Sequence, residues 1–170
     1  MCSFADDGTN LFFVTENTIY HWNGTTLATV TQTVITNPAG IAYLNRTFII
    51  WGDGGLFATS SVGDGTEYNA LNFAEAEVAP DGLLVVKIYN QIAYMIGQKT
   101  TEVWYYSGSG NPPLSRQDTT LVNTGCAAQF SVASSDQYMY WLGDDGLVYQ
   151  IRGTAARPIS DPTLHQQVSD

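Results

Sequence analysis

The sequence predicts an all-β fold, a β-propeller-like array of antiparallel meander blades. Residues 48–52, 93–97 and 139–143 share one pattern, an apolar and aromatic strand that ends in glycine. The spacing between successive glycines is 45 and then 46 residues, and a weaker copy lies at 11–14. A repeat of about this length is typical of four-stranded blades. The pattern predicts three clear blades and one weak one, and it is compatible with either a closed ring or a partial propeller.

The apolar strands of the repeat also favour blades over other β architectures. Residues 48–51 are apolar at every position, whereas a strand with one solvated face alternates apolar and polar residues. Blades are covered on both faces by their neighbours, and a parallel α/β sheet would need helices that the sequence lacks. We therefore expect Trp51, Tyr94 and Trp141 to lie in blade cores.

The first two units are predicted at residues 6–36 and 37–68. In the first, the turn signal Asp6-Asp7-Gly8 precedes strands at 11–15, 18–22 and 26–30. Asn23-Gly24 between two of these strands is a strong hairpin signal. The second unit predicts strands at 41–44, 47–51 and 56–60, with a fourth strand needed to close the blade.

The remaining chain divides into an insert, two further units and a tail, all within one domain of residues 1–170. Residues 69–80 form the only helix-compatible stretch, which Pro80 ends. The third unit, 81–110, predicts strands at 83–89, 92–96 and 101–106. The fourth, 126–160, predicts strands at 129–133, 138–142, 147–152 and 157–159. Residues 161–170 form a tail without periodicity.

Composition excludes several functions. The formal charge is −10, and the six Lys and Arg residues are scattered singly, so attractive nucleic-acid binding is not expected. Acidic walls could still line a passage in which DNA slides without sticking. Cys2 and Cys126 are too few for a disulfide framework or a zinc site. No apolar run reaches membrane-spanning length and no signal peptide is visible, which predicts a reducing, cytoplasm-like compartment.

No residues form a catalytic motif, and no metal or cofactor is expected. Glu75 and Glu77 would point to different sides of a helix, so they do not converge as a carboxylate pair. His21 and His165 lack a serine or cysteine nucleophile in a motif context. The turn Asp144-Asp145-Gly146 serves the backbone and lacks the ligand spacing of a calcium loop. A hydrolase remains a third hypothesis.

The aromatic group Trp104, Tyr105 and Tyr106 is the one candidate interaction site. Clustered aromatic side chains serve as ligand platforms or as anchors of protein interfaces. Because neighbouring side chains of a strand point to opposite faces, we expect part of this group to lie in the core.

An ordered series of segments between Tyr68 and Ser160 resembles the packaged-DNA stabilisation proteins of short-tailed bacteriophages, a tail-hub or tail-accessory family. The segments are the sequence from Tyr68 to Glu77, Pro80-Asp81-Gly82, Ile96-Gly97, Thr101-Glu102-Val103-Trp104, Gly125-Cys126-Ala127, the sequence from Trp141 to Asp145, and Arg157-Pro158-Ile159-Ser160. The upstream part of the chain fits the same family less tightly, and family members are much longer than this chain.

The resemblance implies a β-propeller-containing hub, present as a ring of six copies, that plugs the portal channel and contacts other tail and portal-adaptor proteins. It implies no enzymatic activity, and it places the protein in the virion tail after assembly in the host bacterial cytoplasm. The leading hypothesis is thus a structural virion protein that helps to retain packaged DNA. The alternative is a propeller-type carbohydrate- or receptor-binding module.

Overall fold

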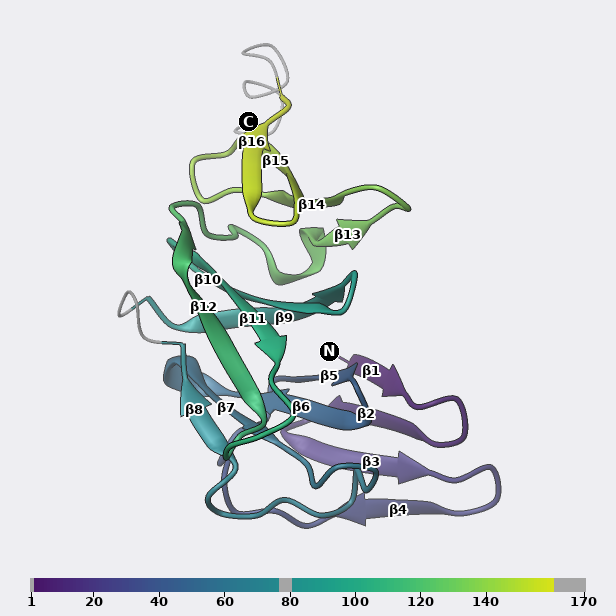
Figure 1. Cartoon of the computed structure of the whole chain (residues 1–170). Coiled ribbons are helices and arrows are strands. Elements are labelled where there is room, and N and C mark those ends of the chain that lie inside the picture. The colour runs from purple at the N-terminus through teal and green to yellow at the C-terminus, as the bar shows by residue number, and fades with distance from the viewer. Residues whose placement is uncertain (1, 77–80, 161–170) are drawn as a thin grey trace.

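A computed structural model shows four antiparallel sheets of four strands each, and it describes residues 2–76 and 81–160 (Figure 1). In every sheet the strands follow one another in chain order, so each sheet is a simple meander. The predicted all-β, propeller-like fold is confirmed, with four blades where the repeat predicted three clear ones and one weak one. Within the described residues, no helix is long and apolar enough to cross a membrane.

The four sheets are named blades 1 to 4. Blade 1 contains β1 (Cys2–Asp6), β2 (Leu11–Thr15), β3 (Thr18–Trp22) and β4 (Leu27–Val30). Blade 2 contains β5 (Gly40–Leu44), β6 (Thr47–Trp51), β7 (Leu56–Thr59) and β8 (Phe73–Glu75), and blade 3 contains β9 (Leu83–Tyr89), β10 (Ile92–Gly97), β11 (Thr101–Tyr106) and β12 (Leu114–Val122). Blade 4 contains β13 (Ala133–Ser134), β14 (Met139–Leu142), β15 (Val148–Arg152) and β16 (Ala155–Pro158). Two short 3-10 turns, η1 (Asp53–Gly55) and η2 (Gln129–Ser131), lie between strands.

The structure corrects the sequence-based elements at the edges of the blades. The helix-compatible insert at 69–80 is wrong in its described part, because Phe73–Glu75 pairs with β7 as the fourth strand of blade 2. Alanine and glutamate favour a helix locally, but the open backbone edge of β7 offers these residues a strand partner. Residues 77–80 and the predicted tail at 161–170 lie outside the described residues.

Three further strands differ from expectation. β1 precedes the Asp6-Asp7-Gly8 turn, so blade 1 begins before the predicted unit. β12, the fourth strand of blade 3, follows the predicted end of the third unit at residue 110. The strand predicted at 129–133 is mostly the turn η2, followed by the two-residue strand β13. β12 is rich in polar residues, and this composition is common in strands at sheet edges but gives a weak sequence signal.

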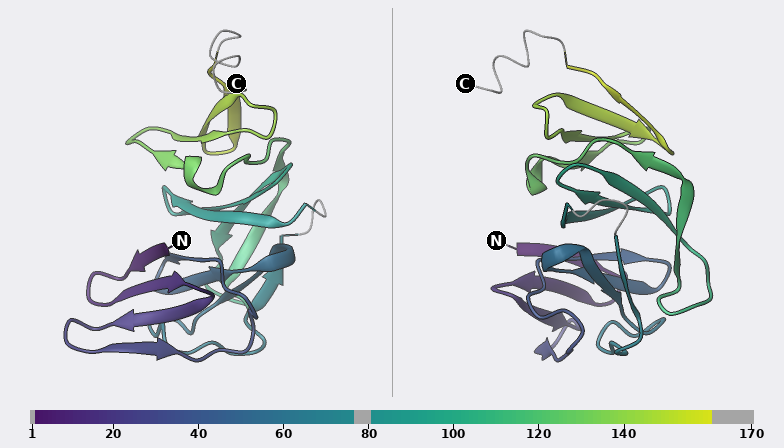
Figure 2. Two further views of the ribbon diagram at one scale, coloured as in Figure 1. Left: turned by 180° about the vertical axis from the view of Figure 1, so that it is seen from behind. Right: turned by 90° about the vertical axis from the view of Figure 1, so that its left-hand side faces the viewer.

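The blades stand in a curved row, with blade 1 and blade 4 at opposite ends (Figure 2). The first strands of the blades, β1, β5 and β9, lie beside one another along the concave side, together with η2. The described residues therefore form an open arc, which is the partial propeller that the sequence allowed.

The aromatic residues of two repeats, Trp51 and Tyr94, each link their blade to the next one. Trp51 in blade 2 donates its indole Nε1–H to the carbonyl of Leu84 in blade 3 at 3.2 Å. Tyr94 in blade 3 donates its hydroxyl to the carbonyl of Gly153 in blade 4 at 2.7 Å, and burial raises the pKa of Tyr94 to about 12. All of these aromatic side chains are buried, Trp141 included, which confirms their predicted place in the blade cores.

The glycine that ends each repeat permits close approach of neighbouring groups. A Cβ on Gly97 would lie 2.7 Å from a carboxylate oxygen of Asp81, and one on Gly143 would lie 2.7 Å from a carboxylate oxygen of Asp145. These two glycines therefore leave room for the carboxylates of Asp81, just before β9, and of Asp145, in the hairpin between β14 and β15.

Gly125→Ala tests a tighter approach, in the connection between blades 3 and 4. A Cβ at this position would lie 2.1 Å from the backbone carbonyl carbon of Gln98, so the connection between blades 3 and 4 would have to shift. We expect the free energy of unfolding, measured by urea denaturation, to fall by about 3 kcal/mol. Ser134→Ala, an exposed change in blade 4, is the control and should have little effect. Equal stability of the two variants would contradict this packing.

Candidate interaction surfaces

The concave side of the arc contains a hollow of about 410 Å³. Its walls come from β1, β5, β9 and η2, so it lies where the blades converge. Phe4 and Phe130 line it and are 61% and 58% exposed, and Asp6 and Lys87 are its charged residues. The hollow combines exposed aromatic surface with few charges, a combination suited to contacts with another protein.

The structure separates the three aromatic residues that the sequence singled out. Trp104 is buried, donates its indole N–H to Glu102 at 2.9 Å, and packs edge-on against Phe57 of blade 2 at a ring distance of 5.1 Å. Tyr105 is 46% exposed and Tyr106 is half-buried. The three side chains therefore do not form one platform, and an interface role for the group stays a prediction that rests on Tyr105.

A buried carboxylate lies beside Trp104. Glu102 is 2% exposed in β11, and the guanidinium of Arg116 on β12 lies 3.9 Å from the same oxygen that accepts from Trp104. A buried carboxylate is stable only where hydrogen bonds and an opposite charge compensate its lost hydration. This group therefore fixes β11 and β12 together within blade 3, and it is part of the core.

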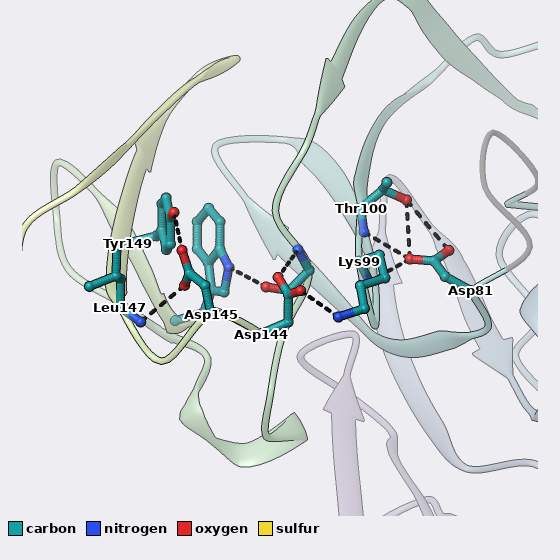
Figure 3. A network of polar contacts seen from close by, with 9 residues as sticks. Asp81, Lys99, Thr100, Asp144, Asp145, Leu147 and Tyr149 are labelled. Carbon is teal, nitrogen blue, oxygen red and sulfur yellow. Dashed lines mark hydrogen bonds and ion pairs between the residues drawn. The ribbon is translucent and has the colours of Figure 1, made fainter. Parts of the chain in front are cut away.

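A network of polar contacts joins blades 3 and 4 (Figure 3). The carboxylate of Asp144 accepts from the Lys99 ammonium at 2.8 Å and from the backbone N–H of Gly125 at 3.3 Å. Asp81 accepts from the backbone N–H groups of Lys99 and Thr100, which orders the turn that presents the lysine. The sequence placed Asp144 in a turn and gave it no partner, because Lys99 is 45 residues away.

The network favours the charged forms of Asp144 and Lys99. The hydrogen bond from Lys99 is the largest cause that holds the pKa of Asp144 below its usual value, and the same bond raises the pKa of Lys99. Asp145, the next residue, instead caps its own hairpin by accepting from the backbone of Leu147 and the hydroxyl of Tyr149. These acidic turn residues therefore serve the blade junction and the hairpin.

Residues with catalytic potential have structural partners. His21 contacts the amide oxygen of Asn10 at 3.0 Å and stacks on Phe12 at a ring distance of 4.6 Å. Cys126 is buried and lies next to Ser131. No group of three or more potential metal ligands occurs in the part of the chain that the structure describes. His165 lies outside that part.

Comparison with known proteins identifies the family. The family model of the β-propeller of bacteriophage P22 Gp10, a phage stabilisation protein, matches residues 1–170. The chain belongs to this family. Membership confirms the resemblance found in the sequence and gives the protein a structural role in a phage. No significant match was found among curated proteins.

Solved structures share the fold of this phage stabilisation protein at low sequence identity. Hsv2 of Kluyveromyces marxianus is 12% identical with a TM-score of 0.56, covering 92% of this chain and 48% of that one. The computationally designed protein Ika4 is 13% identical with a TM-score of 0.57, and the match covers 88% of this chain and 89% of Ika4. PorZ, a surface component of the type-IX secretion system of Porphyromonas gingivalis, is 14% identical with a TM-score of 0.62. The match covers 93% of this chain and 22% of PorZ. The chain thus spans about half the length of Hsv2.

Asp144→Asn tests the junction between blades 3 and 4. Because the pKa of Asp144 is lowered on folding, its contribution to stability is present above the unfolded pKa and is lost as the pH falls through the folded one. We expect the melting temperature of the variant to be about 2 °C below that of the unmodified protein at neutral pH, and the two melting temperatures to converge below about pH 4.

Asp136→Asn, an exposed change at another acidic residue, is the matched control in the same calorimetric pH series. The Lys99 side chain is 67% exposed, so added salt should also reduce the difference in melting temperature between Asp144→Asn and the unmodified protein. A difference in melting temperature that is independent of both pH and salt would contradict an electrostatic role for Asp144.

Proposed function

We propose that the protein is a component of a phage tail hub that closes the portal channel and helps to retain packaged DNA through protein–protein contacts. The observation that carries this proposal is the match of the phage stabilisation family to the whole chain, residues 1–170. The contacts of Glu102, Asp144 and Asp145 support a scaffold, because they join strands and blades.

The charge of the chain suits a channel plug. At a formal charge of −10, the surface repels the DNA phosphates and gives them no adhesive patch. A plug of this kind resists outward movement of the genome mechanically, and its acidic wall leaves the DNA free to slide when the channel opens. A homo-oligomer, with six copies as the family resemblance implies, would provide the matching symmetry around the channel.

Particles that lack the protein should lose DNA. With the gene disrupted, we expect packaging to proceed and the filled heads then to release their genome, measured as nuclease-sensitive DNA in purified particles. Supplying the protein in trans should restore retention. Particles that stay full without it would contradict the plug, and particles that never fill would place the protein in packaging.

Tyr105→Ala tests the exposed part of the aromatic group. Tyr105 is 46% exposed on β11, so its removal should leave the fold intact and lower the amount of protein that remains in washed particles by about tenfold. Tyr138→Ala, at a half-buried tyrosine just before β14, is the control for the loss of a tyrosine ring elsewhere in the chain. Unchanged incorporation would remove Tyr105 from the interface.

A carbohydrate- or receptor-binding module is the second candidate, because Tyr105 could stack on a sugar ring. Binding of the isolated protein to a glycan array, lost in Tyr105→Ala with folding intact, would favour this candidate over the hub.

A further inference from the structure

The turn between β3 and β4 contains Asn23-Gly24, and Asn23 is the only asparagine in the sequence that is followed by glycine. Both residues are exposed, and Gly24 has a φ of +91°, a conformation that glycine adopts without strain. A Cβ added at Gly24 would meet nothing within 4 Å, so the space beside this backbone is open. The turn therefore leaves the Asn23 side chain and the next backbone nitrogen accessible to water.

The Asn23 side chain folds back over its own turn. Its Oδ1 accepts from the backbone N–H of Thr25 at 3.0 Å and from that of Thr26 at 2.8 Å. The N–H of Gly24 has no hydrogen-bond partner among residues 2–76 and 81–160. An N–H without a partner loses its proton more readily than a bonded one, because no hydrogen bond has to be broken.

These contacts place a nucleophile and an oxyanion site around one amide carbon. Once hydroxide removes the proton of the Gly24 N–H, the nitrogen can attack Cγ of Asn23 and form a cyclic imide. Negative charge then develops on Oδ1, where the N–H groups of Thr25 and Thr26 already donate, as in an oxyanion hole. The Cγ–Nδ2 bond breaks, and the nitrogen takes a proton from water and leaves as ammonia.

Water then opens the cyclic imide at one of its two carbonyl groups. Cleavage between the Gly24 nitrogen and Cγ gives aspartate. Cleavage between the same nitrogen and the main-chain carbonyl carbon gives isoaspartate, in which the chain runs through Cβ and Cγ of residue 23. The complete reaction consumes one water, releases one ammonia and exchanges an amide for an acid, so it needs no oxidant, metal or cofactor.

We propose that Asn23 is a site of spontaneous modification, at which the folded protein converts to isoaspartate, and that this conversion loosens β4 from blade 1. The inference goes beyond the proposed function and does not depend on it, because it concerns the chemistry of the isolated chain. Asn69 is an internal reference, since it is exposed and accepts from the backbone N–H of Leu71 at 2.9 Å, but alanine follows it.

The turn that contains Asn23 controls how β4 pairs. Trp22 lies opposite Leu27 directly after the turn, and the register of a hairpin follows from the length and type of its turn. Isoaspartate adds one carbon to the main chain in this turn and displaces the oxygen that bonds to Thr25 and Thr26. Because β4 has only β3 as a strand partner in the described residues, a distorted turn weakens its one attachment within the sheet.

The conversion also changes the surface around the turn. Residues 17–45 contain no Asp, Glu, Lys or Arg, so the new carboxylate is the first charge in this stretch. β4 borders a row of aromatic rings across the same sheet, with 5.7 Å between Phe4 and Phe13 and 5.1 Å between Phe13 and Tyr20. Thr29 of β4 lies opposite Tyr20, so weaker pairing of β4 uncovers this end of the row.

Incubation of the full chain at mildly alkaline pH, followed by peptide mapping with mass spectrometry, tests the modification. We expect Asn23 to convert at least about tenfold faster than Asn69, because glycine leaves the attacking nitrogen unobstructed. The rate should rise in proportion to hydroxide concentration, and isoaspartate should be among the products. Equal rates at Asn23 and Asn69, or the absence of isoaspartate, would overturn the proposal.

Gly24→Ala tests the attacking nitrogen. The added methyl group crowds this nitrogen and should slow conversion of Asn23 at least about tenfold. Gly8→Ala is the matched control, because Gly8 is an exposed turn glycine of the same blade, with a φ of +87° and nothing within 4 Å of an added Cβ. It introduces similar backbone strain and should leave the rate at Asn23 unchanged. Equal slowing by both variants would overturn the assigned role of the Gly24 nitrogen.

Amide hydrogen exchange tests the effect on β4. The isoaspartate form, purified from aged protein, should exchange at least about tenfold faster than fresh protein in Leu27–Val30, with exchange in β6 unchanged. Asn23→Asp adds the same charge but keeps the normal main chain and an acceptor oxygen in the turn, so it should exchange like fresh protein. Unchanged exchange of β4 in the isoaspartate form, or an equal increase in Asn23→Asp, would overturn the loosening of β4.

Discussion

The fold depends on one recurring interaction, in which a buried aromatic residue of a blade satisfies its polar atom on the backbone of the neighbouring segment. Trp51 and Tyr94 bond to carbonyl groups of the following blade, and Trp141 bonds to Gly125 in the connection before its own blade. Each ring thus combines a large buried apolar area with one directional bond. Since an unmade bond of a buried polar group is costly, this pairing fixes both the distance and the rotation between neighbours.

The repeat made the fold predictable, because the residues that set the period are the same residues that form the blade junctions. What the sequence did not reveal lies where local composition and tertiary pairing disagree. Phe73–Glu75 has a helix-favouring context and becomes a strand because β7 has an open edge. β12 is polar enough to resemble a loop, yet it pairs with β11 over most of its length.

The candidate surfaces were less predictable than the fold. The sequence identified Trp104, Tyr105 and Tyr106 as a group but gave no means of telling which one is exposed, since that depends on Phe57 from another blade. The pair of Lys99 and Asp144 needs a contact between residues far apart in the chain. The alternating aromatic residues of β2 and β3 were visible as strands, but only the register with β1 unites them into one face.

The open arc has a consequence for how the molecule loses its structure. Blades contact their immediate neighbours, so the chain resembles a one-dimensional array whose stability is a sum of unit and nearest-neighbour terms. Blades 2 and 3, which each have a described neighbour on both sides, have two such terms. Amide hydrogen exchange should therefore be slowest in β6 and β10, whose side chains are buried along nearly their whole length.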